Sequence, residues 1–225
     1  MRRKNAWTTY NKKQLDELEK LCKNYLKFLD KGKTERECVK QIVKQAEEKG
    51  YVNLADITKD KKALKAGDKV YSVCMDKTVA LFQIGKKKLE KGMNILGAHI
   101  DSPRMDVKQN PLYESEEFAY LDTHYYGGIK KYQWVTLPLA LHGVVVKKDG
   151  TVITVNVGED KNDPVFCVTD LLIHLAGEQM EKKANKVIEG ENLDVLVGSK
   201  PLEGKEKDAV KEGILEILKE KYDMT

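Results

Sequence analysis

An apolar run that ends on a histidine and an aspartate most constrains what this chain can fold into. Residues 94–104 read N-I-L-G-A-H-I-D-S-P-R, so the apolar segment 93–98 leads directly into His99, Asp101 and a proline. A short apolar run before such a stop predicts a buried strand. Side chains alternate along a strand, so His99 and Asp101 would share one face. Functional sites of α/β folds lie at the carboxyl ends of strands, which is where both residues would stand.

The pair His99 and Asp101 admits two interpretations. A carboxylate beside an imidazole can fix the tautomer and orientation of the ring, which is how a metal-bound His is usually supported. The plainer interpretation is a strand-end His hydrogen-bonded to a nearby Asp, with Ser102 and Pro103 forming a turn. The pattern H-x-D-S-P alone favours the plainer interpretation, because any three-residue pattern recurs by chance.

Composition excludes several classes of partner. The 225 residues are enough for one large domain or two small ones. The net charge is only +4, and the basic runs at 59–65 and 86–91 contain no aromatic residue, so we expect no nucleic-acid partner. The four cysteines are far apart and form no C-x-x-C pair, which fits a reducing cytoplasm. No run approaches the ~20 apolar residues of a membrane span, so we expect a cytoplasmic protein without a membrane partner.

Hydrophobic periodicity and turn signals predict an α/β fold in two portions. Four helices are expected, at 11–30, 34–50, 169–186 and 207–222; the second begins at the Thr34/Glu37 capping box and ends at Gly50. The strands are expected at 69–75, 78–84, 93–98, 118–121, 134–141, 143–148 and 152–157. The helices and strands before residue 104 predict an α/β layer, and the later segment is β-rich with helices. The change in composition at 103–111 marks the expected boundary.

Several motifs together resemble the aspartyl-aminopeptidase-like family, metallopeptidase family 18. The stretch G-A-H-I-D-S-P-R-M-D-V-K stands where that family usually has S-H-T-D-S-P followed by an apolar residue and Lys. Residues 123–134 (T-H-Y-Y-G-G-I-K-K-Y-Q-W) resemble its Y-G-G-G segment ahead of a tryptophan. Residues 168–176 (V-T-D-L-L-I-H-L-A) resemble its I-P-D-L-L-P-H-L-A helix, and residues 188–201 resemble its I-x-G-E-x-L-x-x-L-x-G-S-x-P segment. The matches follow the order of the family and run over nearly the whole chain.

The resemblance implies a di-zinc aminopeptidase that removes N-terminal residues, often acidic ones, from peptides; other divalent metals are also compatible. It implies that His99 ligates one Zn²⁺ and that Asp101 is the catalytic-site residue that orients the His99 ring. It also implies a zinc-exopeptidase-like α/β catalytic domain interrupted by a β-rich dimerisation domain, and a homo-oligomer that is commonly dodecameric. Residues 1–104 would form the first part of the catalytic domain, and residues 105–225 most of the inserted domain.

His174 is the third candidate site residue. It is predicted to lie on a helix with Leu171, Leu172 and Leu175, where a lone His is usually a core or interface residue. The resemblance implies an alternative, in which the equivalent His reaches the active site of a neighbouring subunit and contacts substrate. Both interpretations remain open.

The chain departs from the family in two ways. Residues 134–139 read W-V-T-L-P-L in place of W-F-D-R-D-L, so roles of those charged residues do not transfer. The other zinc ligands of the family lie in a second half with no counterpart here, whereas a catalytic zinc needs about three protein ligands. The pairs Glu47-Glu48 and Glu116-Glu117 lack strand-end context and are expected to be solvated.

Two hypotheses about function follow. In the first, the chain is the N-terminal half of an active zinc metallo-aminopeptidase, a hydrolase, and is inactive alone. In the second, it is a non-catalytic assembly or interaction module derived from that family. The coding sequence after Thr225 would distinguish them, because only the first expects the missing ligands to be encoded there or in an adjacent frame.

Overall fold

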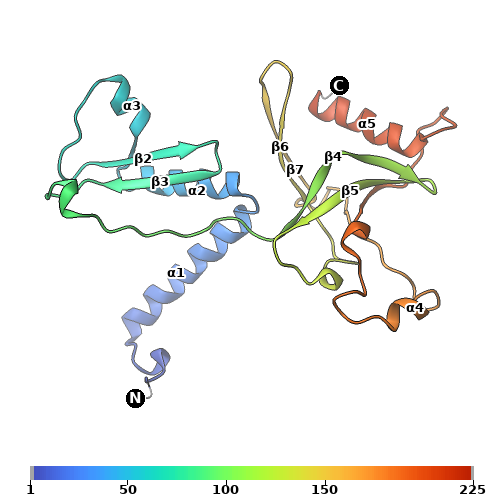
Figure 1. The fold of residues 1–225 in the computed structure, drawn as a ribbon, viewed down its shortest axis with the longest axis horizontal. Coiled ribbons are helices and arrows are strands. Elements are labelled where there is room, and N and C mark those ends of the chain that lie inside the picture. Colours follow the sequence, from blue (N-terminus) through green and yellow to red (C-terminus); the bar gives the residue numbers. More distant parts are fainter. Residues whose placement is uncertain (1–2, 224–225) are drawn as a thin grey trace. The chain divides into compact units, whose positions relative to one another are not determined.

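The computed structural model describes residues 3–223, and they divide between Asp101 and Ser102 into two compact units (Figure 1). We call these the N-terminal unit and the C-terminal unit. Both contain helices and strands, which confirms the predicted mixed α/β class. None of the helices described is long and apolar enough to cross a membrane. The assignment of residues 1–104 and 105–225 to two domains of a longer protein stays a prediction.

The N-terminal unit is a small sheet covered by a helix. Its elements are η1 (Ala6–Thr8), α1 (Lys12–Lys31), α2 (Glu35–Glu47), β1 (Val52–Asn53), α3 (Leu54–Lys59), β2 (Lys69–Cys74), β3 (Thr78–Gln83) and η2 (Leu89–Lys91). The sheet order is β1-β2-β3, with β1 parallel and β3 antiparallel to β2. Cys38 and Val39 of α2 are buried, as are Val70 and Tyr71 of β2, so the core of this unit lies between α2 and the sheet.

Sequence signals at the helix ends are confirmed. Thr34 and Glu37 form the predicted capping box at the start of α2. At its end, the amide of Gly50 donates to the carbonyl of Glu47, and that of Tyr51 donates to the carbonyl of Ala46. This is the bond pattern of a Schellman motif, and it needs a residue such as Gly50 at positive φ, here +81°. The predicted helix end and the hairpin of β2 and β3 are both present.

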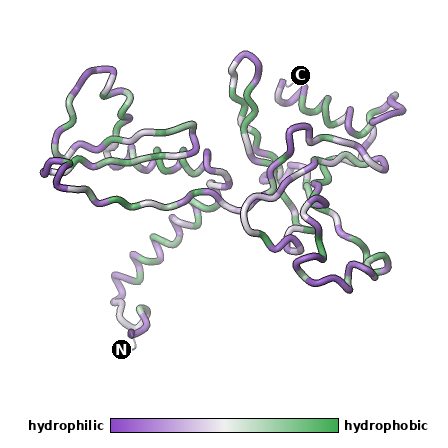
Figure 2. The backbone as a smooth tube through the Cα atoms, in the orientation of Figure 1, coloured by the Kyte–Doolittle hydropathy of each residue, from purple (hydrophilic) through white to green (hydrophobic). Residues whose placement is uncertain are grey.

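The apolar segment 93–98 is not a strand, contrary to the prediction. It is extended without a hydrogen-bonded partner strand, and none of the three described sheets includes it. Ile95 is 80% exposed and Leu96 is 100% exposed. Figure 2 shows hydrophobic stretches along this extended segment after β3. A strand forms only when it pairs with another strand. The sequence of 93–98 favours a strand, but no strand of the described chain lies beside it to form hydrogen bonds.

The C-terminal unit contains two sheets and one long helix. Its elements are β4 (Arg104–Ser115), β5 (Phe118–Tyr126), η3 (Lys131–Gln133), β6 (Leu141–Val146), β7 (Val152–Val157), α4 (Gly177–Met180), η4 (Gly190–Asn192), β8 (Val195–Gly198) and α5 (Ala209–Tyr222). One sheet has the antiparallel order β4-β5-β8, and β6 and β7 form the hairpin predicted at Asp149-Gly150. The core gathers around Leu193, Phe166, Val168 and Ile188.

The strand β4 was not predicted, because its proline was interpreted as part of a domain boundary. The pairing of β4 with β5 shifts register between Val107 and Leu112, and Pro111 lies in that interval. A proline has no amide hydrogen to give to a ladder, so it is tolerated where pairing is interrupted. The irregularity therefore allows one long strand to contain Pro111.

Two predicted elements in the C-terminal unit are wrong. Residues 134–140 make only isolated bridges, because Pro138 lacks an amide hydrogen and Thr136 has a φ of +61°. The helix predicted at 169–186 is reduced to α4, and the amide of Leu175 donates three residues back, to Leu172. Leu172 is 69% exposed, so no packed surface supports an amphipathic helix there.

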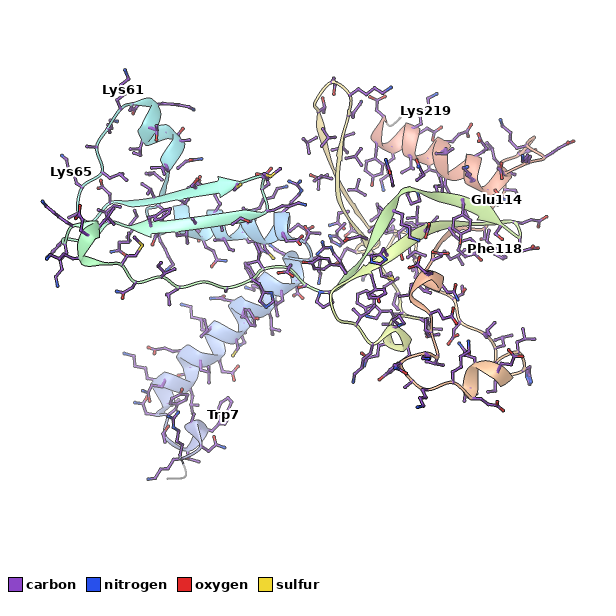
Figure 3. The ribbon with its side chains drawn as sticks, viewed as in Figure 1. Trp7, Lys61, Lys65, Glu114, Phe118 and Lys219 are labelled. Carbon is purple, nitrogen blue, oxygen red and sulfur yellow. The ribbon has the colours of Figure 1, made fainter. Side chains whose placement is uncertain are left out.

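Helix α5 is capped by a side chain distant in sequence. Its first turn donates the amide hydrogens of Val210 and Lys211 to one carboxylate oxygen of Glu114, each at 2.9 Å. Glu114 lies on β4 near the start of α5 (Figure 3). The local N-cap residue, Asp208, makes no such bond. Glu114 therefore takes the place of an N-cap and adds a negative charge at the helix N-terminus.

We expect Glu114→Gln to lower the free energy of unfolding by about 1 kcal/mol, because the amide loses the charge that interacts with the helix dipole. Glu116→Gln, in the exposed turn after β4, is the matched control and should change stability little. Urea unfolding of the two variants measures the difference. Equal stability of both variants would contradict the capping role.

Candidate metal-binding half-site

His99 and Asp101 lie within hydrogen-bonding reach, as predicted. The Nδ1 atom of His99 is 3.3 Å from the Oδ1 atom of Asp101 and 3.2 Å from the backbone carbonyl oxygen of the same residue. The side chain of His99 is 84% exposed and that of Asp101 is 38% exposed. Both side chains come from the extended end of the N-terminal unit. The contact is therefore open to solvent and not sealed in a core.

The contacts of Nδ1 determine which nitrogen of His99 could bind a metal. The two oxygens near Nδ1 are a carboxylate oxygen and a backbone carbonyl oxygen, both of Asp101. Both oxygens accept hydrogen bonds, so both favour a hydrogen on Nδ1. In a neutral ring the lone pair is then on Nε2. A metal-bound His commonly donates its other N–H to a carboxylate or backbone carbonyl in this way. His99 and Asp101 thus have the chemistry of one zinc ligand and its supporting partner.

We expect neutral His99 to carry its hydrogen on Nδ1, and added Zn²⁺ to perturb Nε2 first. Two-dimensional ¹⁵N NMR of the imidazole rings distinguishes the two nitrogens. Asp101→Asn should leave this tautomer in excess, because the backbone carbonyl still accepts from Nδ1. A majority of the Nε2–H tautomer in the unsubstituted chain would contradict the proposed ligand geometry.

The described residues form no larger cluster of potential metal ligands around this pair. Among residues 3–223 no group of three or more His, Cys, Asp or Glu side chains is placed to hold a metal ion. Glu47 accepts a hydrogen bond of 2.7 Å from the hydroxyl of Tyr71, which raises the pKa of that tyrosine. Glu116 and Glu117 are exposed turn residues with positive φ. Neither glutamate pair adds a ligand to His99.

His174 is an exposed residue of the C-terminal unit and not part of a helix, so the predicted helical setting is wrong. It lies in the turn before α4, and its neighbours Leu172 and Leu175 are also exposed. A buried core role is therefore excluded for this conformation. Its role in binding substrate at a neighbouring subunit stays a prediction.

The sequence did not predict a group of hydrogen-bonded, partly buried polar residues in the C-terminal unit. The hydroxyl of Tyr113 donates to Asp194 at 2.6 Å, while Thr123, which is 2% exposed, donates its amide to the same carboxylate. Burial, followed by the bond to Asp194, raises the pKa of Tyr113. These contacts join β4 and β5 to the segment before β8. Tyr113 and Thr123 are 81 and 71 positions from Asp194, so no local pattern reveals these contacts.

A second polar cluster fixes the same region from the surface. The ammonium of Lys108 is 2.8 Å from Asp122 and 2.9 Å from Glu191. The hydrogen bond from Lys108 lowers the pKa of Glu191. Lys108 of β4 thus forms ion pairs with Asp122 of β5 and Glu191 of η4. This ion-pair network connects η4 to β4 and β5. We assign it a structural role.

Comparisons with known proteins agree with the α/β fold. The family model described as aminopeptidase I zinc metalloprotease (M18) matches residues 28–225. A probable M18 family aminopeptidase 1 of Clostridium acetobutylicum is 60% identical over 223 residues, which are 99% of this chain and 48% of the relative. The crystal structure of the Thermotoga maritima M18 aminopeptidase matches with a TM-score of 0.91 at 44% identity, over 100% of this chain and 48% of that one. That of aminopeptidase I from Clostridium acetobutylicum matches with a TM-score of 0.86 at 58% identity, over 100% and 50%.

The fold and the matched family model thus define the class of protein, the zinc metalloproteases of the M18 type. The chain belongs to the aminopeptidase I zinc metalloprotease (M18) family. This confirms the family identified from the motifs around His99 and along the C-terminal unit. The chain spans about half the length of the relatives it matches.

Proposed function

We propose that this chain is the N-terminal half of a zinc metallo-aminopeptidase and contributes one metal ligand, His99, to a site completed by a second polypeptide segment. The contact of His99 Nδ1 with Asp101 carries the proposal, because it prepares Nε2 as a ligand. Family membership supports the use of zinc. In the longer protein, residues 1–104 would belong to the catalytic domain and residues 105–225 to an inserted dimerisation domain.

Each residue of the half-site has a separate task. His99 would hold the ion through Nε2, and Asp101 would keep the imidazole oriented by accepting from Nδ1. When bound, Zn²⁺ supplies Lewis acidity for hydrolysis of a peptide bond. We propose two ions in the completed site and a glutamate outside this chain as the general base. One imidazole cannot supply the binding free energy of roughly 10–16 kcal/mol found for complete structural zinc sites, so the chain alone should hold zinc weakly.

The substrates and assembly follow from the same proposal. The completed enzyme would release N-terminal residues, often acidic, from peptides in the cytoplasm. It would act as a homo-oligomer, with the dodecamer as the expected form. His174, exposed in the C-terminal unit, would then be available to a neighbouring subunit's substrate.

Zinc content tests this function without relying on turnover. The chain is co-expressed with the part of the Clostridium acetobutylicum relative that it does not match, and the co-purified complex is dialysed and analysed for metal. We expect retained zinc in the complex and little in the chain alone, and His99→Ala should lower the zinc content of the complex. Co-assembly without retained zinc would favour the alternative function, a non-catalytic assembly module.

A further inference from the structure

A small cavity in the C-terminal unit is lined mainly by lysines. It has a volume of about 390 Å³ and lies where the segment 182–190, which follows α4, meets η3. The charged residues of its lining are four lysines and one glutamate: Lys131, Lys182, Lys183, Lys186 and Glu189. Small-molecule sites in proteins have volumes of roughly 300–1,000 Å³, so the cavity is large enough for a ligand. The whole chain has a net charge of only +4, so this excess of positive charge is local.

Most of these positive charges have no opposite charge beside them. The ammonium of Lys182 is 3.4 Å from a carboxylate oxygen of Glu189. Lys131, Lys183 and Lys186 form no ion pair with any residue between 3 and 223. Like charges that line one cavity repel each other, and a bound anion would replace that repulsion with attraction. The cavity therefore has the electrostatic character of an anion site.

The core of the C-terminal unit holds the walls of the cavity in place. Ile188, which also lines the cavity, is 8% exposed and belongs to that core. A Cβ atom on Gly190 would lie 2.6 Å from Cε1 of Tyr125, so the backbone at Gly190 packs directly against β5. The ammonium of Lys131 is 5.8 Å from the centre of the same tyrosine ring. Because the walls are formed before a ligand arrives, little additional order is needed for binding.

We propose that this cavity binds a small organic phosphate through Lys131, Lys183 and Lys186. An ammonium group binds phosphate as a point charge, whereas the forked guanidinium of arginine is better matched to planar carboxylates. None of the described residues that line the cavity is an arginine. Ile188 offers an apolar surface to the organic part of the ligand. The proposal does not depend on peptidase activity, because all of these residues belong to the C-terminal unit.

Isothermal titration calorimetry of the 225-residue chain with phenyl phosphate tests the proposal. This probe combines a doubly charged phosphate with an apolar ring. We expect a Kd below about 1 mM at low salt. Inorganic phosphate should bind about tenfold or more weakly, because it buries no apolar surface, and benzoate should bind more weakly than phenyl phosphate, because it carries a single charge. A Kd for phenyl phosphate well above that value, or equal affinity for any two of the three probes, would overturn the proposal.

Two double substitutions show whether the lysines of the cavity are responsible. Lys183→Gln with Lys186→Gln removes two charges from exposed residues of the cavity and should weaken binding of phenyl phosphate about tenfold or more. Lys86→Gln with Lys87→Gln removes the same charge from exposed residues of the N-terminal unit and should leave the affinity unchanged. Thermal unfolding of both variants should match that of the unsubstituted chain. Equal weakening in the two variants would indicate general attraction to a basic surface and would contradict a site at the cavity.

Discussion

His99→Ala is expected to remove chelator-sensitive peptide hydrolysis from the co-assembled enzyme. The substitution deletes the imidazole that we propose as a zinc ligand, and it also removes the ring that the carboxylate of Asp101 contacts. Asp101→Asn should cost less, about 10–100-fold, because the backbone carbonyl of residue 101 still contacts Nδ1. Initial rates on a chromogenic aminopeptidase substrate, together with zinc content, measure both effects.

The control for this pair is His124→Ala. His124 is a β5 residue with a 62% exposed side chain, and it should be replaceable with little loss of rate. Full activity of His99→Ala, or an equal loss in His124→Ala, would show that His99 has no special role. A loss of rate in His99→Ala with unchanged zinc content would contradict its assignment as a ligand.

Leu193→Ala is expected to produce the largest loss of stability in the C-terminal unit. Leu193 is 0% exposed and lies within the cluster formed with Phe166, Val168 and Ile188. Truncating a buried leucine removes apolar contacts and leaves a cavity, which costs about 2–5 kcal/mol. Urea unfolding, followed by circular dichroism, measures the change. Leu175→Ala, at a residue that is 70% exposed, removes the same atoms and should be nearly neutral. Similar losses in both would contradict the core position of Leu193.

Local signals in the sequence predicted the ends of α2 and the hairpin of β6 and β7. The capping box at Thr34, the glycine stop at Gly50 and the Asp149-Gly150 turn all form contacts within a few residues. Such contacts do not depend on the rest of the chain. The same reasoning predicted the proximity of His99 and Asp101, since two residues separated by one other residue in extended backbone can contact each other.

The errors occurred where distant partners decide the structure. Segment 93–98 has a strand's composition but no strand beside it in the described chain. The helix predicted around His174 has apolar residues at suitable spacing, yet they are exposed and meet no packed surface. Glu114 caps a helix almost a hundred positions later in sequence, a contact that no local pattern encodes.

Hydrolysis of Asp- and Leu-terminated chromogenic substrates tests the central claim most directly. The purified 225-residue chain and its complex with the second half of the Clostridium acetobutylicum relative are assayed with added zinc, with and without a chelator. We predict turnover by the complex that the chelator abolishes, and no chelator-sensitive turnover by the chain alone. Robust, chelator-sensitive turnover by the chain alone, lost in His99→Ala, would show that a complete site exists within these residues and would contradict the half-site.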